Sequence, residues 1–392
     1  MLAACAAIPL PEPLPPAVAP APPTPPAASA AADGSSPAVS VLQSPAWQWA
    51  DQQALPPPLR QGKSVWMPVR WSELPGWGAD SLPQAWNAWL RSCEKPTGAA
   101  TPALCQEVRQ LSIAGSVEQH EWMMRRLQPY RVQAPSGEAS GLLTGYYEPT
   151  LVASRLPQGP YQTPLYAPPA QLPQGRPWFT RQQIATDPAA LDALQGRAIA
   201  WLADPIDALL LQIQGSGRLL ITEPDGRQRQ VRLAYAAHNG HPYRSVARWL
   251  LDRRDISSGT WEAIRAWAAG QPPARIDEML WSNPRTVFFR EEPLSDFEAQ
   301  FGPRGAQGVA LTPGRSIAVD RDSIPYGTPV WLHTPGPHAQ LQRLVLAQDT
   351  GSAIVGAVRA DYFTGWGDAA YTLAAGLKQP LQLWALWPRP TP

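Results

Sequence analysis

Three aspartates near the C-terminal end of the chain are placed where they could do acid–base chemistry. They are Asp320 in SIAVDRD, Asp349 in LVLAQDTG and Asp361 in RADYFTG. Each lies at or near the end of a predicted strand, next to a turn that contains Gly or Pro. Carboxylates that converge repel one another, which raises the pKa of at least one of them. Such a group stays protonated near neutral pH and can act as a general acid.

The same residues allow other interpretations. Aspartates in turns commonly serve as Asx-turn or capping residues, and Asp322 is a fourth acid in the same segment. A calcium site is a further reading, but the acids lack the D-x-D-x-D loop spacing. No His or second Cys pair stands at zinc-ligand spacing. No GxGxxG opens a helix and no P-loop is present, so we expect neither a metal nor a cofactor.

The strands that must position these acids favour a small barrel. The segments SIAVDRD, TPVWLHT, RLVLAQD and LQLWALW read as short strands, separated by Pro and Gly turns. Short strands at this spacing are typical of a barrel rather than of a doubly wound sheet. Strand ends gather at one rim of a closed barrel, so acids that are distant in sequence can meet there.

The middle of the chain mixes helices and strands. Apolar spacing predicts helix over residues 76–132, followed by the strand-like block LLTGYYEPTLVASR. A hairpin is expected over 219–231 around Pro224-Asp225-Gly226. Helices are predicted over 243–253, 260–269 and 276–281.

The N-terminal region reads as an anchored tether. Residues 1–60 are rich in proline, and residues 1–50 carry only Glu12 and Asp33 as charges. Such a segment cannot bury enough apolar surface to fold, so we expect an extended tether. Leu2-Ala3-Ala4-Cys5 resembles the lipobox of bacterial lipoproteins, although the usual basic and apolar stretch is missing before it. The alternative is an ordinary Ala-rich N-terminus.

The two remaining cysteines fit an oxidising compartment. Cys93 and Cys105 are twelve residues apart, and in a cell envelope they are expected to form a disulfide. The alternative is two unrelated buried thiols.

The overall composition excludes one class of function. Lys and Arg number 32 against 31 Asp and Glu, so the net charge is +1, and a nucleic-acid binder would need a basic excess. The 18 tryptophans make carbohydrate binding one candidate. At helical spacing, Trp249 and Trp267 are expected to be packing residues.

Several blocks together resemble one known family. SIAVDRDSIPYGTPVWL and LVLAQDTGSAIVGAVRADYFTGWGDAA are similar to the three-aspartate domain of the membrane-bound lytic murein transglycosylase A (MltA) family. Upstream, LLTGYYEPTL, LQIQGSG, AYAAHNGHPYRSVARWLLDR and MLWSNPRTVFFRE agree with it in the same order. The resemblance spans roughly residues 142–387.

The resemblance implies a mainly β fold with helices (α+β), in which a double-psi β-barrel domain carries a second, smaller β-domain inserted into it. Residues 1–60 would be the N-terminus and tether, and 61–148 the helical first part of the main domain. Residues 149–284 would be the inserted glycan-binding domain, and 285–392 the C-terminal barrel part.

The resemblance also implies a reaction. Members of the family cleave the β-1,4 bond between N-acetylmuramic acid (MurNAc) and N-acetylglucosamine (GlcNAc) in peptidoglycan. The muramic C6 hydroxyl attacks its own anomeric carbon and leaves a 1,6-anhydro ring. The expected partners are peptidoglycan glycan strands and, through Cys5, the periplasmic face of the outer membrane. A monomer is expected, alone or within a cell-wall complex.

By resemblance to the family's three-aspartate motif, Asp361 is expected to be the catalytic acid and Asp349 its partner, and Asp320 matches the third aspartate. Gly365 and Gly367 would allow close approach of glycan or backbone. The candidates for glycan binding are Tyr146, Glu148, Gln214, Ser216, Asn239, Tyr243, Arg244 and Trp366. Of these, Tyr146 and Tyr243 could equally be core aromatics.

Two other functions stay open at this point. One is a non-catalytic peptidoglycan-binding protein with a decayed site. The other is a muramidase that uses two carboxylates, as ordinary glycosidases do.

Overall fold

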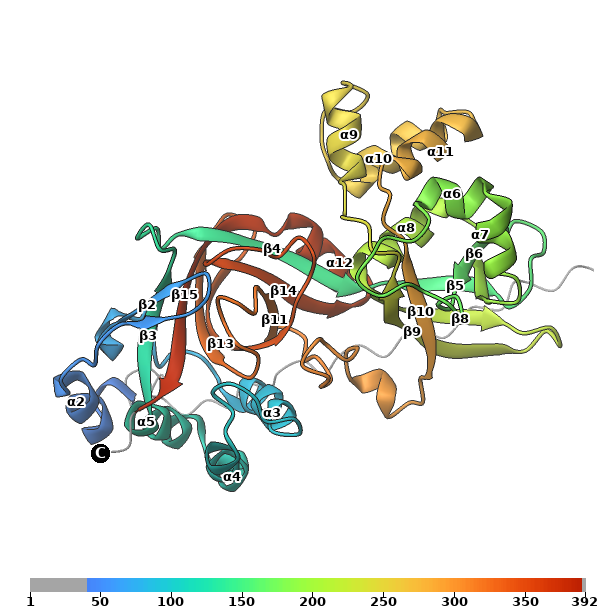
Figure 1. Ribbon diagram of the computed structural model, residues 1–392. Coiled ribbons are helices and arrows are strands. Elements are labelled where there is room, and N and C mark those ends of the chain that lie inside the picture. The colour runs from blue at the N-terminus through green and yellow to red at the C-terminus, as the bar shows by residue number, and fades with distance from the viewer. Residues whose placement is uncertain (1–40, 390–392) are drawn as a thin grey trace, which may run out of the picture. The chain divides into compact units, whose positions relative to one another are not determined.

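The computed structural model describes residues 41–389, whose strands form two sheets (Figure 1). The larger sheet has the order β1-β2-β3-β15-β12-β13-β11-β14-β4. Its strands are β1 (Leu59–Arg60), β2 (Val65–Pro68), β3 (Leu127–Gln133), β4 (Gly141–Glu148), β11 (Ser316–Val319), β12 (Pro329–Pro335), β13 (Gln340–Asp349), β14 (Arg359–Trp366) and β15 (Lys378–Pro388).

Six of these strands close into a barrel. β15 pairs with β12 along one stretch and with β4 along another, so the ring β4-β14-β11-β13-β12-β15 has no open edge. The β11–β13 and β4–β14 pairs are parallel, and the other pairs in the ring are antiparallel. Apolar side chains such as Ile317, Val345 and Leu383 fill the interior and stabilise it by the removal of apolar surface from water. The small barrel predicted from the sequence is therefore confirmed.

The smaller sheet is formed by the inserted segment, in the order β10-β9-β8-β5-β7-β6. Residues 219 and 231 are paired across the antiparallel strands β8 and β9, which confirms the predicted hairpin. The strands are β5 (Thr150–Ser154), β6 (Thr163–Tyr166), β7 (Ala198–Leu202), β8 (Ser216–Thr222), β9 (Gln228–His238) and β10 (Val287–Pro293).

Helices flank both sheets. The barrel part carries α2 (Pro45–Gln52), α3 (Pro83–Ser92), α4 (Pro102–Gln110), α5 (Ser116–Arg126) and α12 (Gly367–Gly376), and short 3-10 helices at Trp71–Glu73, Leu111–Ile113 and Glu298–Gln300. The insert carries α6 (Arg181–Thr186), α7 (Pro188–Ala193), α8 (Pro205–Gln214), α9 (Val246–Asp252), α10 (Trp261–Ala269) and α11 (Pro273–Trp281). None of the helices in residues 41–389 is both long enough and apolar enough to cross a membrane.

Tryptophan serves mainly as core packing. Trp71, Trp86, Trp89 and Trp331 are almost fully buried in the cluster where the N-terminal helices meet the barrel. Helix α3 contributes its buried face because its apolar residues recur at three- and four-residue intervals. Trp249 and Trp267 are partly buried against the α9–α11 cluster, as expected.

Three of the predicted boundaries are wrong. The C-terminal boundary predicted for the tether, residue 60, is too late, because α2 forms before it and buries Ala46 and Ala50. Residues 1–40, which include Cys5, lie outside the described residues. The helix predicted over 76–132 gives way to strand β3, whose register with β15 overrides helical spacing. The insert does not end at residue 284, because β10 pairs with β9.

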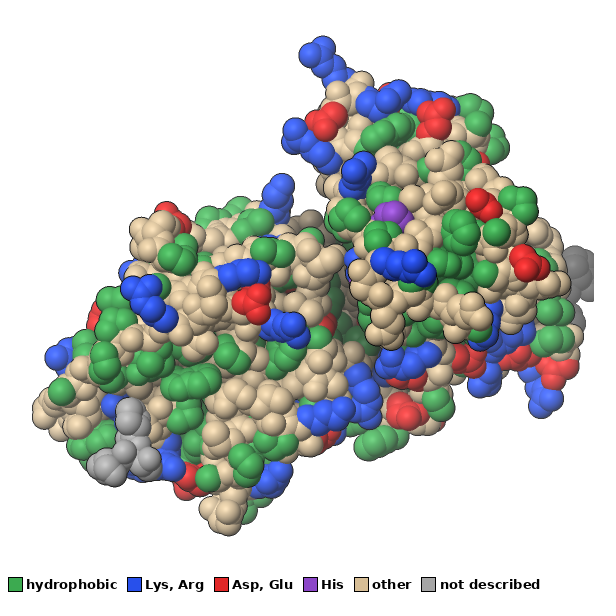
Figure 2. Space-filling model, viewed as in Figure 1, with side chains coloured by type: hydrophobic (Ala, Val, Ile, Leu, Met, Phe, Trp, Pro, Cys, Tyr) green, Lys and Arg blue, Asp and Glu red, His purple; other side chains and the backbone are tan. Residues whose placement is uncertain are grey.

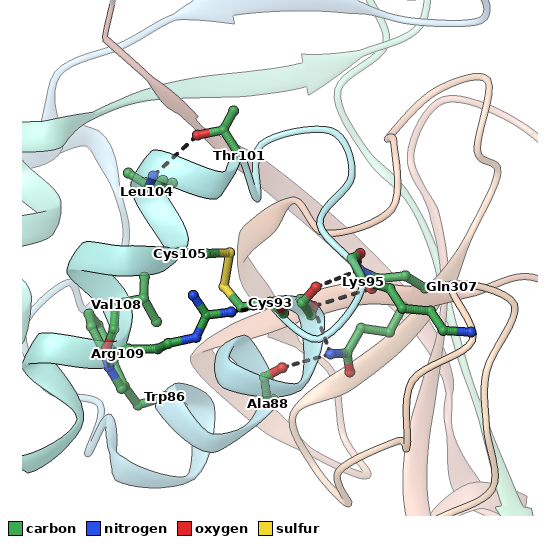
Figure 3. Close-up of a disulfide and its surroundings, with 12 residues drawn as sticks. Trp86, Ala88, Cys93, Lys95, Thr101, Leu104, Cys105, Val108, Arg109 and Gln307 are labelled. Carbon is green, nitrogen blue, oxygen red and sulfur yellow. Dashed lines mark hydrogen bonds between the residues drawn. A yellow bond between two sulfur atoms is a disulfide. The ribbon is translucent and has the colours of Figure 1, made fainter.

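A disulfide joins the C-terminal end of helix α3 to the first turn of α4 (Figure 3). Cys93 and Cys105 lie 5.5 Å apart between Cα atoms, so the predicted bridge is confirmed. Beside it, the Gln307 side-chain amide donates hydrogen bonds to the carbonyl oxygens of Ser92 (3.2 Å) and Lys95 (3.1 Å). The bridge therefore stabilises the end of α3 on which the 303–308 loop rests.

Replacing Cys93 and Cys105 by Ser is expected to lower the free energy of unfolding by about 3 kcal/mol, because a short closed loop restricts the unfolded chain. Urea unfolding with and without reductant measures the change. The reductant should destabilise the parent protein and leave the double variant unaffected. A parent protein with the same midpoint in both conditions would contradict the prediction.

Candidate active site

A groove runs between the barrel strands and the insert. It consists of two adjoining pockets of about 220 and 550 Å³, one reaching Asp361 and the other Asp349. The pockets are continuous because they share six lining residues: Gln212, Ile213, Arg285, Val287, Gly351 and Ser352. One wall comes from α8 and β10 of the insert, and the other from the segment after β13.

Strand pairing places Asp349 and Asp361 on either side of one residue. Ala318 of β11 is paired with Asp349 on β13 and with Asp361 on β14. Two strand spacings separate the acids, which corresponds to about 10 Å between their Cα atoms. The predicted convergence of these two acids at one rim is therefore present.

Asp361 is half-buried, with one free oxygen. Its Oδ1 accepts a hydrogen bond from the Thr144 hydroxyl, and Thr144 in turn accepts one from Arg359 (2.9 Å). Its Oδ2 has no hydrogen-bond partner among residues 41–389. Burial raises the pKa of Asp361 to about 6; the Thr144 hydrogen bond and the Arg359 charge oppose this shift, and the Asp349 charge adds to it.

Asp349 has both oxygens occupied. Its Oδ2 accepts a hydrogen bond from the Tyr146 hydroxyl (2.9 Å), and its Oδ1 accepts from the amides of Ala306 and Thr350 (both 2.9 Å). Burial raises the pKa of Asp349, although these three hydrogen bonds act in the opposite direction. Asp349 is therefore a fixed neighbour of Asp361 rather than a freely available acid.

Asp320 does not line either pocket, so the prediction that all three acids converge is wrong for it. It accepts hydrogen bonds from the Lys63 ammonium (3.0 Å) and the Gly356 amide (2.9 Å). Burial alone would raise its pKa, but these donors outweigh burial and lower it. Asp320 therefore stays ionised and stabilises the turn at Gly356, before β14. Asp322 is exposed, and its Oδ2 lies 3.4 Å from the Lys63 ammonium.

Replacing Thr144 by Val removes the hydroxyl that favours ionised Asp361, so the pKa of Asp361 is expected to rise further above 6. Carboxyl NMR titration of the labelled protein measures this shift. Thr372→Val is the matched control, because Thr372 is exposed and its hydroxyl donates to the Asp368 carbonyl oxygen in α12, away from Asp361. An unchanged Asp361 titration in Thr144→Val would show that the hydroxyl does not tune the acid.

Glu148 is not a groove residue, which corrects the prediction. It is fully buried and accepts hydrogen bonds from Arg218 (2.8 Å) and Arg232 (2.5 Å) of the insert sheet. Both arginines also donate to the Phe301 carbonyl oxygen. Because Glu148 ends β4 of the barrel, this cluster ties the two sheets together.

Trp366 is not placed to stack on sugar either. The Arg218 guanidinium covers its ring at 3.8 Å, and the residue lines neither groove pocket. Gly365 and Gly367 have φ of +110° and +80°, so their conformation serves the turn between β14 and α12.

Four of the other predicted residues line the groove. Gln214 and Ser216 flank Gly215, whose φ of +83° ends α8 and turns the chain into β8. Tyr146 lines the larger pocket with them, and Tyr243 lines the smaller one. Both tyrosines are partly exposed, and the ring of Tyr146 also packs against Phe363.

Asn239 and Arg244 are not groove residues. Asn239 is buried, and its amide donates to the carbonyl oxygens of Phe179 and Pro284 (both 2.8 Å). Arg244 is exposed and absent from both pocket linings. Asn239, which precedes Gly240, thus holds loop backbone in place instead of facing the groove.

Several residues of the groove were not predicted from the sequence. Thr144 donates a hydrogen bond to Asp361, and both Thr144 and Arg359 lower the pKa of Asp361. Arg285 lines both pockets. The period of two in strands could have identified the first two, because Thr144 shares a strand face with Tyr146, and Arg359 with Asp361. No local pattern indicates Arg285.

Comparisons with known proteins agree with this architecture. The MltA specific insert domain matches residues 142–290, and the 3D domain matches residues 315–387. The lytic transglycosylase LtgG of Burkholderia pseudomallei is 40% identical, with a TM-score of 0.56 over 86% of this chain and 99% of its own. MltA from Neisseria gonorrhoeae is 28% identical, with a TM-score of 0.71 over 87% and 97%. The chain belongs to the MltA family.

The match to Escherichia coli (strain K12) membrane-bound lytic murein transglycosylase A is shorter. It is 33% identical over 254 residues, which make up 62% of this chain and 64% of that protein, less than two thirds of its length. E. coli MltA with bound chitohexaose superimposes with a TM-score of 0.64 at 24% identity, over 86% of this chain and 96% of that one. The predicted double-psi β-barrel with an inserted domain is confirmed by these folds.

Proposed function

We propose that this protein is a lytic transglycosylase that cleaves the β-1,4 bond between MurNAc and GlcNAc in peptidoglycan, with Asp361 as its single acid and base. The observation that carries the proposal is the state of Asp361: in the groove, half-buried, with a pKa near 6 and an unoccupied Oδ2. The lytic transglycosylases among its relatives, and the chitohexaose bound to E. coli MltA, support a glycan substrate.

One carboxyl group suffices because the nucleophile belongs to the substrate. Asp361 donates its proton to the glycosidic oxygen as the bond to the muramic anomeric carbon breaks. The muramic C6 hydroxyl then bonds to that carbon, and its proton passes to the Asp361 carboxylate, which restores the acid. An attacking group held in the same sugar avoids the entropy cost of recruiting water. Burial keeps the pKa of Asp361 raised, and the charge of Asp349 adds to this shift.

The groove disfavours the muramidase alternative. A two-carboxylate hydrolase needs a second carboxylate to act as nucleophile or to activate water. Asp349 is the other acid lining the groove within residues 41–389, and its oxygens already accept three hydrogen bonds. Mass spectrometry of digested sacculi tests this: anhydro ends support our proposal, reducing muramic ends support hydrolysis, and no cleavage supports a binding protein.

The rate is expected to depend on pH through Asp361. Because the acid must be protonated at the start, kcat/KM should fall as pH rises above about 6, by about tenfold per unit. The pH profile on soluble glycan strands measures this. A rate that stays constant from pH 6 to pH 8 would show that a group other than Asp361 donates the proton.

We also propose that the protein is a monomeric lipoprotein at the periplasmic face of the outer membrane, acting alone or within a cell-wall complex. The support is the lipobox-like Leu2-Ala3-Ala4-Cys5, the disulfide, and the relatives described as membrane-bound in Gram-negative bacteria.

A further inference from the structure

The groove carries an excess of positive charge that acid catalysis does not use. Two carboxylates, Asp349 and Asp361, line the two pockets, whereas the chain as a whole is nearly neutral at +1. Lys and Arg side chains are also spread over the face drawn in Figure 2. The cations that line the groove are Lys95, Arg181, Arg285, Arg290, Arg304 and Arg359.

Some of these cations already have roles in the fold or beside the acid. Arg181 donates to the Asn283 carbonyl oxygen (3.0 Å) and the Gln212 amide oxygen (2.7 Å), and Arg359 donates to Thr144. Arg290 is paired with Glu292 (2.8 Å). These contacts fix the groove wall.

Lys95, Arg285 and Arg304 have no side-chain partner among residues 41–389. None of the three forms a salt bridge with a carboxylate of residues 41–389. Within the described part of the chain, Arg304 and Arg285 donate only to carbonyl oxygens, those of Gly308 (3.2 Å) and His241 (3.1 Å). Their charges are therefore available to an anionic ligand in the groove.

Two of the free cations stand beside the site itself. The Lys95 ammonium lies against Gly308, where an added Cβ would come within 2.6 Å of it. Arg304 belongs to the same 303–308 loop, whose Ala306 amide donates to Asp349. Lys95 lies two residues after Cys93, so the disulfide holds the loop that carries Lys95 in place (Figure 3). A glycan next to Asp349 would lie within reach of both cations.

The sugar rings of peptidoglycan are uncharged, so a neutral glycan gives these cations nothing to bind. Carboxylates enter the substrate through the muramic residue, either on its peptide stem or, once the stem is removed, on the free lactyl group. We propose that Lys95, Arg285 and Arg304 bind stem-peptide carboxylates, so that the protein prefers stem-bearing strands. This rests on the proposed function and adds the substrate class to it.

The proposal is tested by measuring glycan binding to variants that also carry Asp361→Asn, so that the glycan is not cleaved during the measurement. Lys95→Gln with Arg304→Gln is compared with Arg227→Gln plus Arg248→Gln, two exposed arginines that line neither groove pocket. The probes are soluble stem-bearing strands, strands stripped to the free lactyl carboxylate, and neutral chitohexaose.

The groove pair should weaken binding of stem-bearing strands about tenfold, since each partly exposed ion pair contributes a few-fold. Added salt should likewise weaken the binding of stem-bearing strands to the parent protein, because it screens the ion pairs. The control pair should leave all three affinities unchanged, and the groove pair should leave chitohexaose affinity unchanged.

Two results would overturn the proposal. If the Lys95→Gln, Arg304→Gln variant bound stem-bearing strands as tightly as the parent does, these cations would not bind a substrate carboxylate. An equal loss with stripped strands would assign the lactyl carboxylate instead of the stem. Failure of the proposed function would appear separately, as no anhydro product from the active chain.

Discussion

Replacing Asp361 by Asn is expected to reduce the release of anhydro-muropeptides from sacculi by about 10²- to 10⁴-fold, the usual contribution of a general acid–base group. An amide cannot donate a proton to the leaving oxygen, and Asp349 cannot substitute because its oxygens already accept three hydrogen bonds. The side-chain volume hardly changes, so glycan binding should survive. Product release followed by chromatography measures the loss.

Asp368→Asn is the matched control for this variant. Asp368 is exposed in the first turn of α12, lines neither pocket and undergoes the same chemical change. It should retain parental activity. Equal activity in Asp361→Asn and the parent would remove Asp361 from the mechanism.

Replacing Glu148 by Gln is expected to cost about 3–5 kcal/mol of stability, the usual effect of removing one partner from a buried ion pair. Glu148 is fully buried, and neutralising it leaves two largely buried guanidinium groups, those of Arg218 and Arg232, without a counter-charge. Because these residues join β4 to β8 and β9, the link between barrel and insert should weaken as well. Urea unfolding measures the change.

Asp225→Asn is the control, since the Asp225–Arg227 pair lies exposed at the tip of the β8–β9 hairpin. Exposed pairs contribute little, so its unfolding midpoint should match that of the parent. If Glu148→Gln also unfolded at the parental midpoint, the buried cluster would not be what holds the two sheets together.

The sequence predicted those features that depend on local periodicity. Alternating apolar residues and turn residues identified the C-terminal strands, and the Pro224-Asp225-Gly226 turn identified the hairpin. The expectation that Asp349 and Asp361 lie close to strand ends was enough to indicate a shared rim; Asp349 ends β13, and Asp361 lies near the start of β14. The resemblance to the MltA family then supplied the inserted domain, which no periodicity could have shown.

What the sequence could not predict is the partner of each charged group. Asp320 directly follows strand β11, whereas Asp361 lies within β14. Against burial, the Gly356 amide and Lys63, which is 257 residues away in the sequence, lower the pKa of Asp320, whereas burial raises the pKa of Asp361. Glu148 was predicted as a glycan-binding residue together with Tyr146, because both belong to the block GYYEP. Glu148 is buried by its ion pairs with Arg218 and Arg232, which lie 70 and 84 residues further along the chain.

Strand β3 illustrates the same limit. Its sequence continues the apolar spacing of α5, but pairing with β2 and β15 makes it extended. Tertiary pairing of this kind overrides local propensity.

The central claim is that the muramic C6 hydroxyl, and not water, attacks the anomeric carbon. Digestion of peptidoglycan in water enriched in heavy oxygen tests it most directly, with the products analysed by mass spectrometry. We predict muropeptides that are one water molecule lighter than hydrolysis products and carry no heavy oxygen. Reducing muramic ends labelled with heavy oxygen would contradict the account.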